Sequence, residues 1–64
     1  MDTRAKNMEH GFEYEGLQVR IIEPVTNTYA TVFLLKDGQY VDQFIAKRGD
    51  AEREAKERIN SRLH

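Results

Sequence analysis

Apolar and polar residues alternate along the first half of the chain, and this alternation predicts a strand. Residues 11–24 read GFEYEGLQVRIIEP, so that large apolar side chains alternate with charged or polar ones on both sides of Gly16. A period of two is typical of a half-buried strand, because successive side chains point to opposite faces. Gly16 indicates a bulge, or a tight bend between a short arm and the main strand. Pro24 ends the strand, because it cannot donate a backbone hydrogen bond.

A second pattern predicts a β-hairpin, with strands over about residues 28–35 and 39–46. Both arms are rich in β-branched and aromatic residues, and Lys36-Asp37-Gly38 connects them. A two-residue Asp-Gly turn would pair Lys36 with Gln39, whereas a three-residue loop would shift the register by one residue. We favour the three-residue loop because it makes better apolar cross-strand pairs. Those pairs are Phe33 with Val41, Tyr29 with Ile45, Leu34 with Tyr40 and Ala30 with Phe44.

The last part of the chain predicts one helix. Gly49 breaks the preceding strand, and the Asp50 carboxylate suits an N-cap, where it can accept from free backbone N–H groups. The apolar residues that follow are four apart, which gives a narrow stripe on one side of a helix. They are Ala51, Ala55, Ile59 and Leu63.

Together these elements predict an α+β fold in two layers, a three-stranded antiparallel β-meander with a C-terminal helix packed on one face (β-β-β-α). We expect a single domain over residues 11–64. Residues 1–10 are mostly polar, and we expect them to form a disordered tail.

One face of this sheet has no predicted cover. In the favoured register both faces of the hairpin carry large apolar side chains, and the narrow helix stripe can cover only one of them. The sequence does not decide which face that is. Scattered apolar exposure is ordinary on a protein surface, and the arm with Phe12 and Tyr14 could also close part of the gap. The alternative is a partner surface formed by Tyr29, Thr31, Phe33, Leu35, Val41 and Ile45.

The short chain favours a protein that is stabilised by association with a partner. The chain has 64 residues, and a domain of this size buries only about 60% of its unfolded surface. Small domains often need a disulfide, a metal or a second subunit, but this chain has no cysteine. His10 and His64 are too far apart in sequence to suggest a metal site. Self-association, through the uncovered face or a sheet edge, or binding to another protein is therefore the leading hypothesis.

The residue pattern does not predict an enzyme, a cofactor site or a metal site. Ser61 is the only serine, and no neighbouring residue could serve as its base. The glycines are widely spaced, so no phosphate-binding loop is predicted. Glu13 and Glu15 alternate on one strand, which is more typical of a solvated face than of an acid–base pair.

Nucleic-acid binding is the alternative function. A three-stranded sheet backed by a helix can enter the major groove, and the order of elements resembles that of plant AP2-type and integrase arm-binding domains, although none of their motif residues is matched. The candidate contacts are Arg20, Lys36, Lys47 and Arg48, with Tyr29 or Tyr40 as stacking groups. Few cations lie on the hairpin, and acidic residues lie among them, so nucleic acid is the less favoured partner.

Charge and hydropathy limit the kinds of partner and the cellular location that we expect. The net charge is −1 and the pI about 6.1, so no overall field attracts nucleic acid or anionic lipid. The longest apolar run, residues 32–35, is too short to span a bilayer. We expect no membrane association. The absence of cysteine and of an export signal suggests the cytoplasm.

Three stretches together resemble small bacterial proteins of uncharacterised function. They are GFEYEGLQVRIIEP, YATVFLLKDGQYVDQF and DAEREAKERI, which fall within residues 11–63. The resemblance implies three strands, a helix with alanine at every fourth position, and no known activity. The matching positions are Tyr14, Gly16, Leu17, Asp37, Gly38, Phe44, Ala51 and Ala55.

Overall fold

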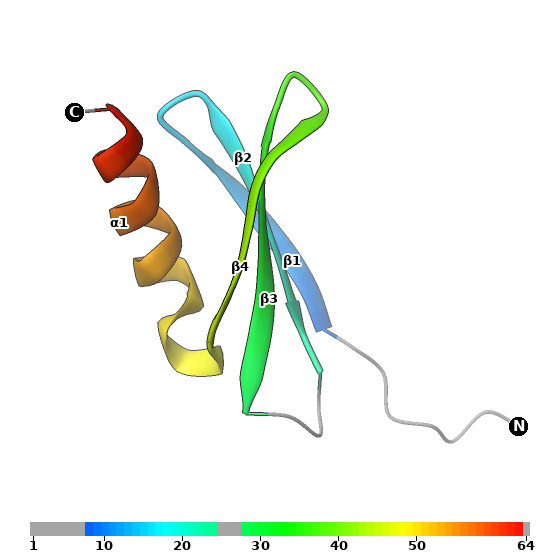
Figure 1. Ribbon diagram of the computed structural model, residues 1–64. Coiled ribbons are helices and arrows are strands. Elements are labelled where there is room, and N and C mark those ends of the chain that lie inside the picture. Colours follow the sequence, from blue (N-terminus) through cyan, green and yellow to red (C-terminus); the bar gives the residue numbers. More distant parts are fainter. Residues whose placement is uncertain (1–7, 25–27, 64) are drawn as a thin grey trace, which may run out of the picture.

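The protein is a four-stranded antiparallel sheet with one helix, so the prediction of three strands is wrong. A computed structural model describes residues 8–24 and 28–63. Its elements in chain order are β1 (Met8–Tyr14), β2 (Leu17–Glu23), β3 (Tyr29–Lys36), β4 (Gln39–Lys47), a short 3-10 turn η1 (Arg48–Asp50) and α1 (Ala51–Leu63). The strands lie in the order β1-β2-β3-β4, a simple meander. The fold is α+β, in two layers (Figure 1).

The additional strand is β1, which forms a hairpin with β2. The turn consists of Glu15 and Gly16, whose φ angles are 53° and 82°. Two successive positive φ angles give a type I′ turn, whose twist matches that of the flanking strands. Gly16 is therefore a hairpin residue rather than a bulge within one strand. Residues 1–7 of the predicted tail lie outside the described residues, and β1 begins at Met8.

The hairpin of β3 and β4 closes with the two-residue Asp-Gly turn, so the favoured three-residue loop is wrong. Its turn contains two residues, Asp37 and Gly38, so that Lys36 pairs with Gln39. The register then shifts between Leu34 and Leu35, and the remaining pairs follow from Leu34 with Asp42 to Tyr29 with Lys47. Val41 has no partner on β3 and forms a β-bulge. Each β3 residue beyond the bulge pairs with the β4 residue one position later than in an unbroken two-residue hairpin.

This register preserves most of the predicted faces. Beyond the bulge every pair is displaced by two residues from the prediction, and a shift of two keeps each side chain on its own side of the sheet. Val32 thus lies opposite Phe44, and Ala30 opposite Ala46. Tyr40 is the exception. It pairs with Leu35 and contacts the Phe33 ring, with the ring centroids 5.3 Å apart.

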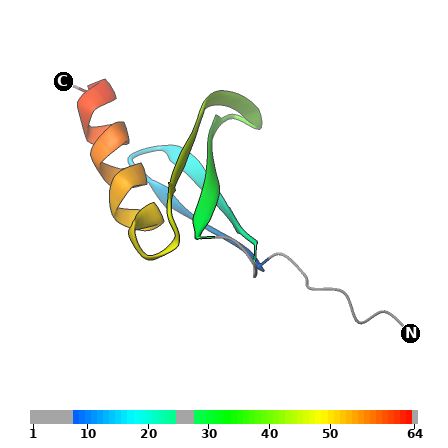
Figure 2. The ribbon, with the colours of Figure 1, turned by 60° about the horizontal axis from the view of Figure 1, so that its bottom comes forward.

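The helix answers the question that the sequence left open, because it covers the face that carries Val32 and Leu34. Figures 1 and 2 show α1 along one side of the sheet. Its buried residues are Ala51, Ala55 and Ile59. Leu63, predicted to belong to the same stripe, is 53% exposed, because a spacing of four residues drifts around the helix. The sheet contributes Leu17, Val19, Ile21, Ala30, Val32, Leu34 and Ala46 to the same core.

Cationic side chains widen the narrow apolar stripe of α1 on both sides. Lys56 lies over the rings of Phe12 and Tyr14, with its Nζ atom 5.6 and 5.7 Å from the ring centroids. On the other side, the Arg58 guanidinium lies 4.2 Å from the centroid of Phe44. The stems of long cationic side chains can cover apolar surface while their charges stay in water. In this way one short helix covers rings that lie beyond the reach of its alanines.

Gly11 provides a test of the β1–β2 pairing. A Cβ atom at Gly11 would lie 2.5 Å from the carbonyl oxygen of Val19, a backbone atom, so the strands would have to move apart. We expect Gly11→Ala to destabilise the protein by about 1–3 kcal/mol, the usual cost of overpacking. Gly49→Ala is the matched control, because a Cβ atom there has no neighbour within 4 Å. Urea unfolding followed by circular dichroism measures both, and equal stabilities would contradict the pairing.

Candidate protein-interaction face

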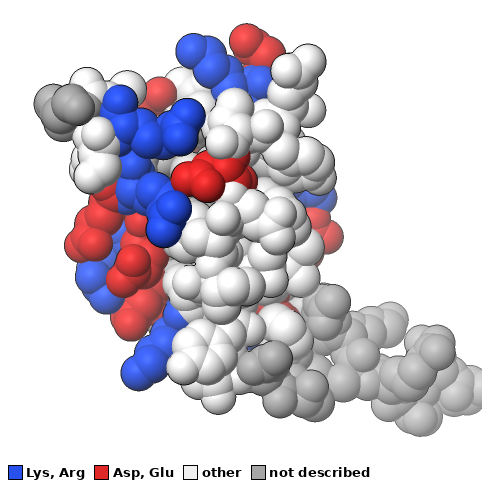
Figure 3. Space-filling model, viewed as in Figure 1, with Lys and Arg blue, Asp and Glu red and all other residues white. Residues whose placement is uncertain are grey.

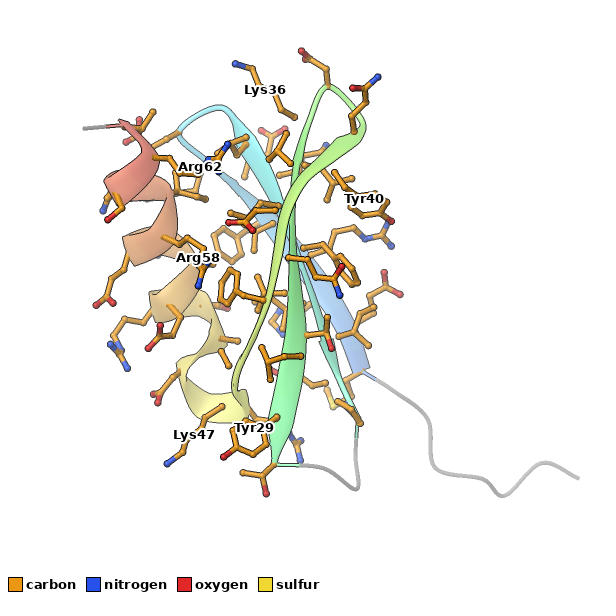
Figure 4. The ribbon with its side chains drawn as sticks, viewed as in Figure 1. Tyr29, Lys36, Tyr40, Lys47, Arg58 and Arg62 are labelled. Atoms are coloured by element: carbon orange, nitrogen blue, oxygen red, sulfur yellow. The ribbon has the colours of Figure 1, made fainter. Side chains whose placement is uncertain are left out.

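The side of the sheet opposite α1 has no cover within the described residues. We call it the bare face. Strand alternation and the register place on it Glu9, Gly11, Glu13, Gln18, Arg20, Ile22, Tyr29, Thr31, Phe33, Leu35, Tyr40, Gln43, Ile45 and Lys47. Figure 4 shows Tyr40 directed away from the helix side. Val41 lies in the bulge beside this face.

Large apolar side chains are unusually exposed here. Tyr40 is 66% exposed, Ile45 61%, Tyr29 50% and Val41 37%. Phe33 and Thr31 are half-buried between them, whereas Leu35 is buried. In Figure 3 the charged side chains gather over α1, and a broad uncharged surface lies beside them over β3 and β4. Several exposed large apolar side chains on one uncharged surface are typical of an interaction site.

All six candidate partner residues can now be placed. Strand pairing brings Tyr29, Thr31, Phe33, Leu35 and Ile45 to the bare face, with Val41 beside it. Leu35 offers little area to a partner, because it is 7% exposed. Two further contributors were assigned elsewhere or overlooked. Tyr40 was expected on the other face, and Ile22 becomes part of the surface because it pairs with Thr31.

Charged residues on the bare face are few, and all of them except Arg20 lie on its two edge strands. β1 contributes Glu9 and Glu13, whereas β4 contributes Lys47. Between them Arg20 forms an ion pair with Glu9. Among the described residues, no ion pair forms for Glu13 or Lys47. The face therefore has an acidic edge and a basic edge, with apolar side chains and the paired Arg20 between them.

A hollow lies in this face at Gly11. It has a volume of about 350 Å³, and its lining includes the side chains of Glu13, Gln18 and Arg20. The hollow exists because Gly11 has no side chain in a row where its neighbours do. Its floor is strand backbone and its walls are polar, which suits a flat aromatic side chain with a polar tip.

The open edge of β4 is protected against pairing with a strand of another chain. The Asp42 carboxylate accepts a hydrogen bond of 2.8 Å from the backbone N–H of Gln43. It also lies 3.3 Å from Arg58 and 4.0 Å from Arg62, and both arginines extend from α1 towards β4 in Figure 4. A bulge and a charged side chain on an edge strand are common barriers to pairing with another chain. Addition of a strand along β4 is therefore disfavoured.

The same carboxylate makes part of the stability depend on pH. The hydrogen bond from Gln43 lowers the pKa of Asp42 below its ordinary value of 3.8, and the nearby Arg58 and Arg62 act in the same direction. A lowered folded-state pKa gives stability that is present above the ordinary value and is lost as the pH falls through the folded-state pKa.

We therefore expect Asp42→Asn to be less stable than the parent protein by roughly 1 kcal/mol at pH 6 and equally stable at pH 2. Urea unfolding at the two pH values measures the difference. Asp37→Asn is the control, because Asp37 lies in a turn at positive φ, a conformation that asparagine also tolerates. A difference that persists at pH 2 would contradict the role of the Asp42 carboxylate.

The four candidate nucleic-acid contacts do not form a cluster. Arg20 lies in the middle of the bare face, and its charge is paired with Glu9. Lys36 and Lys47 lie at opposite ends of the hairpin, as Figure 4 shows. Lys47 pairs with Tyr29, seven residues from Lys36, which corresponds to about 23 Å along the strand. Arg48 lies in η1, beyond the end of β4.

Other kinds of site receive no support from the described residues. Within residues 8–24 and 28–63, no group of three histidine, cysteine or acidic side chains could hold a metal ion. No helix in this part of the chain is long and apolar enough to cross a membrane. Comparisons with protein-family models, with curated proteins and with solved structures find no match.

Proposed function

We propose that this protein is a small non-enzymatic interaction module that binds another protein surface, with a second copy of itself as the favoured partner, through the bare face. The observation that carries the proposal is the exposure of Tyr29, Tyr40, Val41 and Ile45 together on or beside one sheet face, opposite the helix. In a monomer these apolar side chains stay in contact with water, whereas an interface that covers them gains the free energy of removing apolar surface from water.

The size of the face sets the expected strength of binding. Four strands about 4.8 Å apart and seven residues long cover roughly 19 by 23 Å, or about 440 Å² in projection. Two copies would together bury about 900 Å² or somewhat more, which is at the low end for specific complexes. We expect a reversible complex with a dissociation constant in the micromolar range.

Nucleic-acid binding has weaker support. Its candidate cations are dispersed, and one of them is paired with an acidic residue. Affinity for nucleic acid depends on several cations acting on one run of phosphates, and falls steeply with salt. We also propose the cytoplasm as the location, since a chain without cysteine needs no oxidising compartment in order to fold.

Dilution experiments by NMR test the proposal. Between millimolar and low micromolar concentration, amide resonances of β3 and β4 residues on the bare face should shift, and those of the outer side of α1 should not. The shifts should change little when salt is raised, because an apolar interface is insensitive to screening. Resonances that do not move with concentration, or that move only over α1, would overturn self-association through this face.

A further inference from the structure

The bare face carries matching features on its two edges, and these specify how a second copy would lie on it. The hollow at Gly11 lies over β1 and β2, and Tyr40, the most exposed large apolar side chain among the described residues, belongs to β4. Glu9 and Glu13 also belong to β1, whereas Lys47 belongs to β4. β1 and β4 are the two edge strands of the sheet.

Two sheets that pack face to face with aligned strands can be related by a twofold axis in the interface in two ways. An axis parallel to the strands reverses the strand order, so that β1 of one copy lies over β4 of the other. An axis perpendicular to the strands places β1 over β1 and β4 over β4. The first arrangement brings acidic and basic edges together, and the second brings like charges together, which costs binding energy.

The geometry points to the first arrangement: we propose that the protein forms a face-to-face twofold dimer in which Tyr40 of each copy enters the Gly11 hollow of the other. This inference rests on the proposed function and adds the orientation of the partner. Gly11 shares a row with Arg20, Phe33 and Gln43, and Tyr40 belongs to the adjacent row with Leu35. With β1 over β4, an axis parallel to the strands sets each row against its own copy, so that Tyr40 lies over Glu13, which lines the hollow.

The chemistry of the hollow suits a phenol. The ring of Tyr40 would occupy space over the Gly11 backbone, and its hydroxyl group would reach the Glu13 carboxylate or the Gln18 amide in the wall. Buried tyrosines usually place the hydroxyl on such a polar partner. The hollow is thus completed by the second copy, because the same chain provides both the hollow and the side chain that fills it.

Truncation of the inserted side chain should weaken the dimer. We expect Tyr40→Ala to raise the dissociation constant by at least about 10-fold, as for tyrosines at the centre of an interface. Gln39→Ala is the control on the same hairpin, because Gln39 is exposed and pairs with Lys36 at the hairpin end. Sedimentation equilibrium gives both constants. Equal constants for the two variants would overturn the insertion of Tyr40.

Cross-linking between single cysteines tests the orientation, since the chain has no cysteine of its own. Glu13→Cys on β1 and Gln43→Cys on β4 are each prepared alone and then mixed, and a short bismaleimide is added. With β1 over β4, the mixture should give at least about 10-fold more cross-linked dimer than either variant alone, because only then are the two thiols neighbours.

The possible outcomes separate this inference from the proposed function. Strong cross-linking of Glu13→Cys alone would mean that β1 meets β1, and would overturn the orientation while the dimer remained. A dimeric mass with no cross-linking in any of the three samples would mean that β1 does not lie over β4, and would also overturn the orientation. A monomeric mass for the uncross-linked protein would overturn both proposals.

Discussion

Replacing Ile45 with aspartate should abolish self-association at micromolar concentration while the monomer remains folded. Ile45 is 61% exposed in the single chain and lies on the bare face, on the edge strand β4. In the proposed dimer its side chain would be covered twice, once in each copy, and a carboxylate there would lose its hydration without gaining a cationic partner. We expect the dissociation constant to rise on the order of 100-fold or more, a change of about 3 kcal/mol.

Leu63→Asp is the matched control for this substitution. Leu63 is 53% exposed, but it lies in the last turn of α1, away from the bare face. Both variants exchange an exposed aliphatic side chain for a charge, so both should change the stability of the monomer by only about 1 kcal/mol or less. Equal loss of association in the two variants would mean that net charge, rather than the bare face, controls assembly.

Replacing Ile59 with alanine should have the largest effect on folding. Ile59 is fully buried and supplies most of the bulk with which α1 packs on the sheet, since Ala51 and Ala55 are the other buried residues of the helix. Truncation of a buried isoleucine to alanine costs about 2–5 kcal/mol. A domain of this size has only about 3–5 kcal/mol from its core, so much of the variant should be unfolded at room temperature.

Thermal unfolding below the concentration of self-association measures this effect. A loss of 3 kcal/mol corresponds to a fall in Tm of roughly 12–24 °C for a chain of this size. Leu63→Ala, four residues further along the same helix, should leave Tm nearly unchanged because its side chain is exposed. Similar falls in Tm for the two variants would contradict the observed orientation of α1.

The hydrophobic pattern was sufficient for the helix and for the three strands whose side chains alternate clearly. It failed at β1, where Met8-Glu9-His10-Gly11 carries too little apolar character to suggest a strand. These residues lie in the sheet because β1 pairs with β2, not because they bury much of their own surface. The tight bend at Gly16 was one of two predicted alternatives, but a two-residue hairpin turn was not expected because Glu15, unlike asparagine or aspartate, seldom adopts a positive φ.

The division of the hairpin's side chains between its two faces was predicted better than the register, with Tyr40 as the exception. Within each strand, residues with odd numbers lie on one face and residues with even numbers on the other. Beyond the bulge at Val41 the observed pairs differ from the predicted ones by two residues, which leaves each side chain on its predicted face. What the sequence could not provide was the choice of face. On the face that the helix covers, Lys56 and Arg58 lie over the rings of Phe12, Tyr14 and Phe44. The spacing of apolar residues along the helix does not predict these contacts.

The central claim is that the bare face holds a second copy of the chain, and the molar mass in solution tests it most directly. Sedimentation equilibrium of the full chain from about 1 µM to 1 mM, a range that brackets the expected micromolar dissociation constant, should show a reversible transition from monomer to dimer. The transition should lie at nearly the same concentration in low and high salt. A monomeric mass throughout this range would contradict the account.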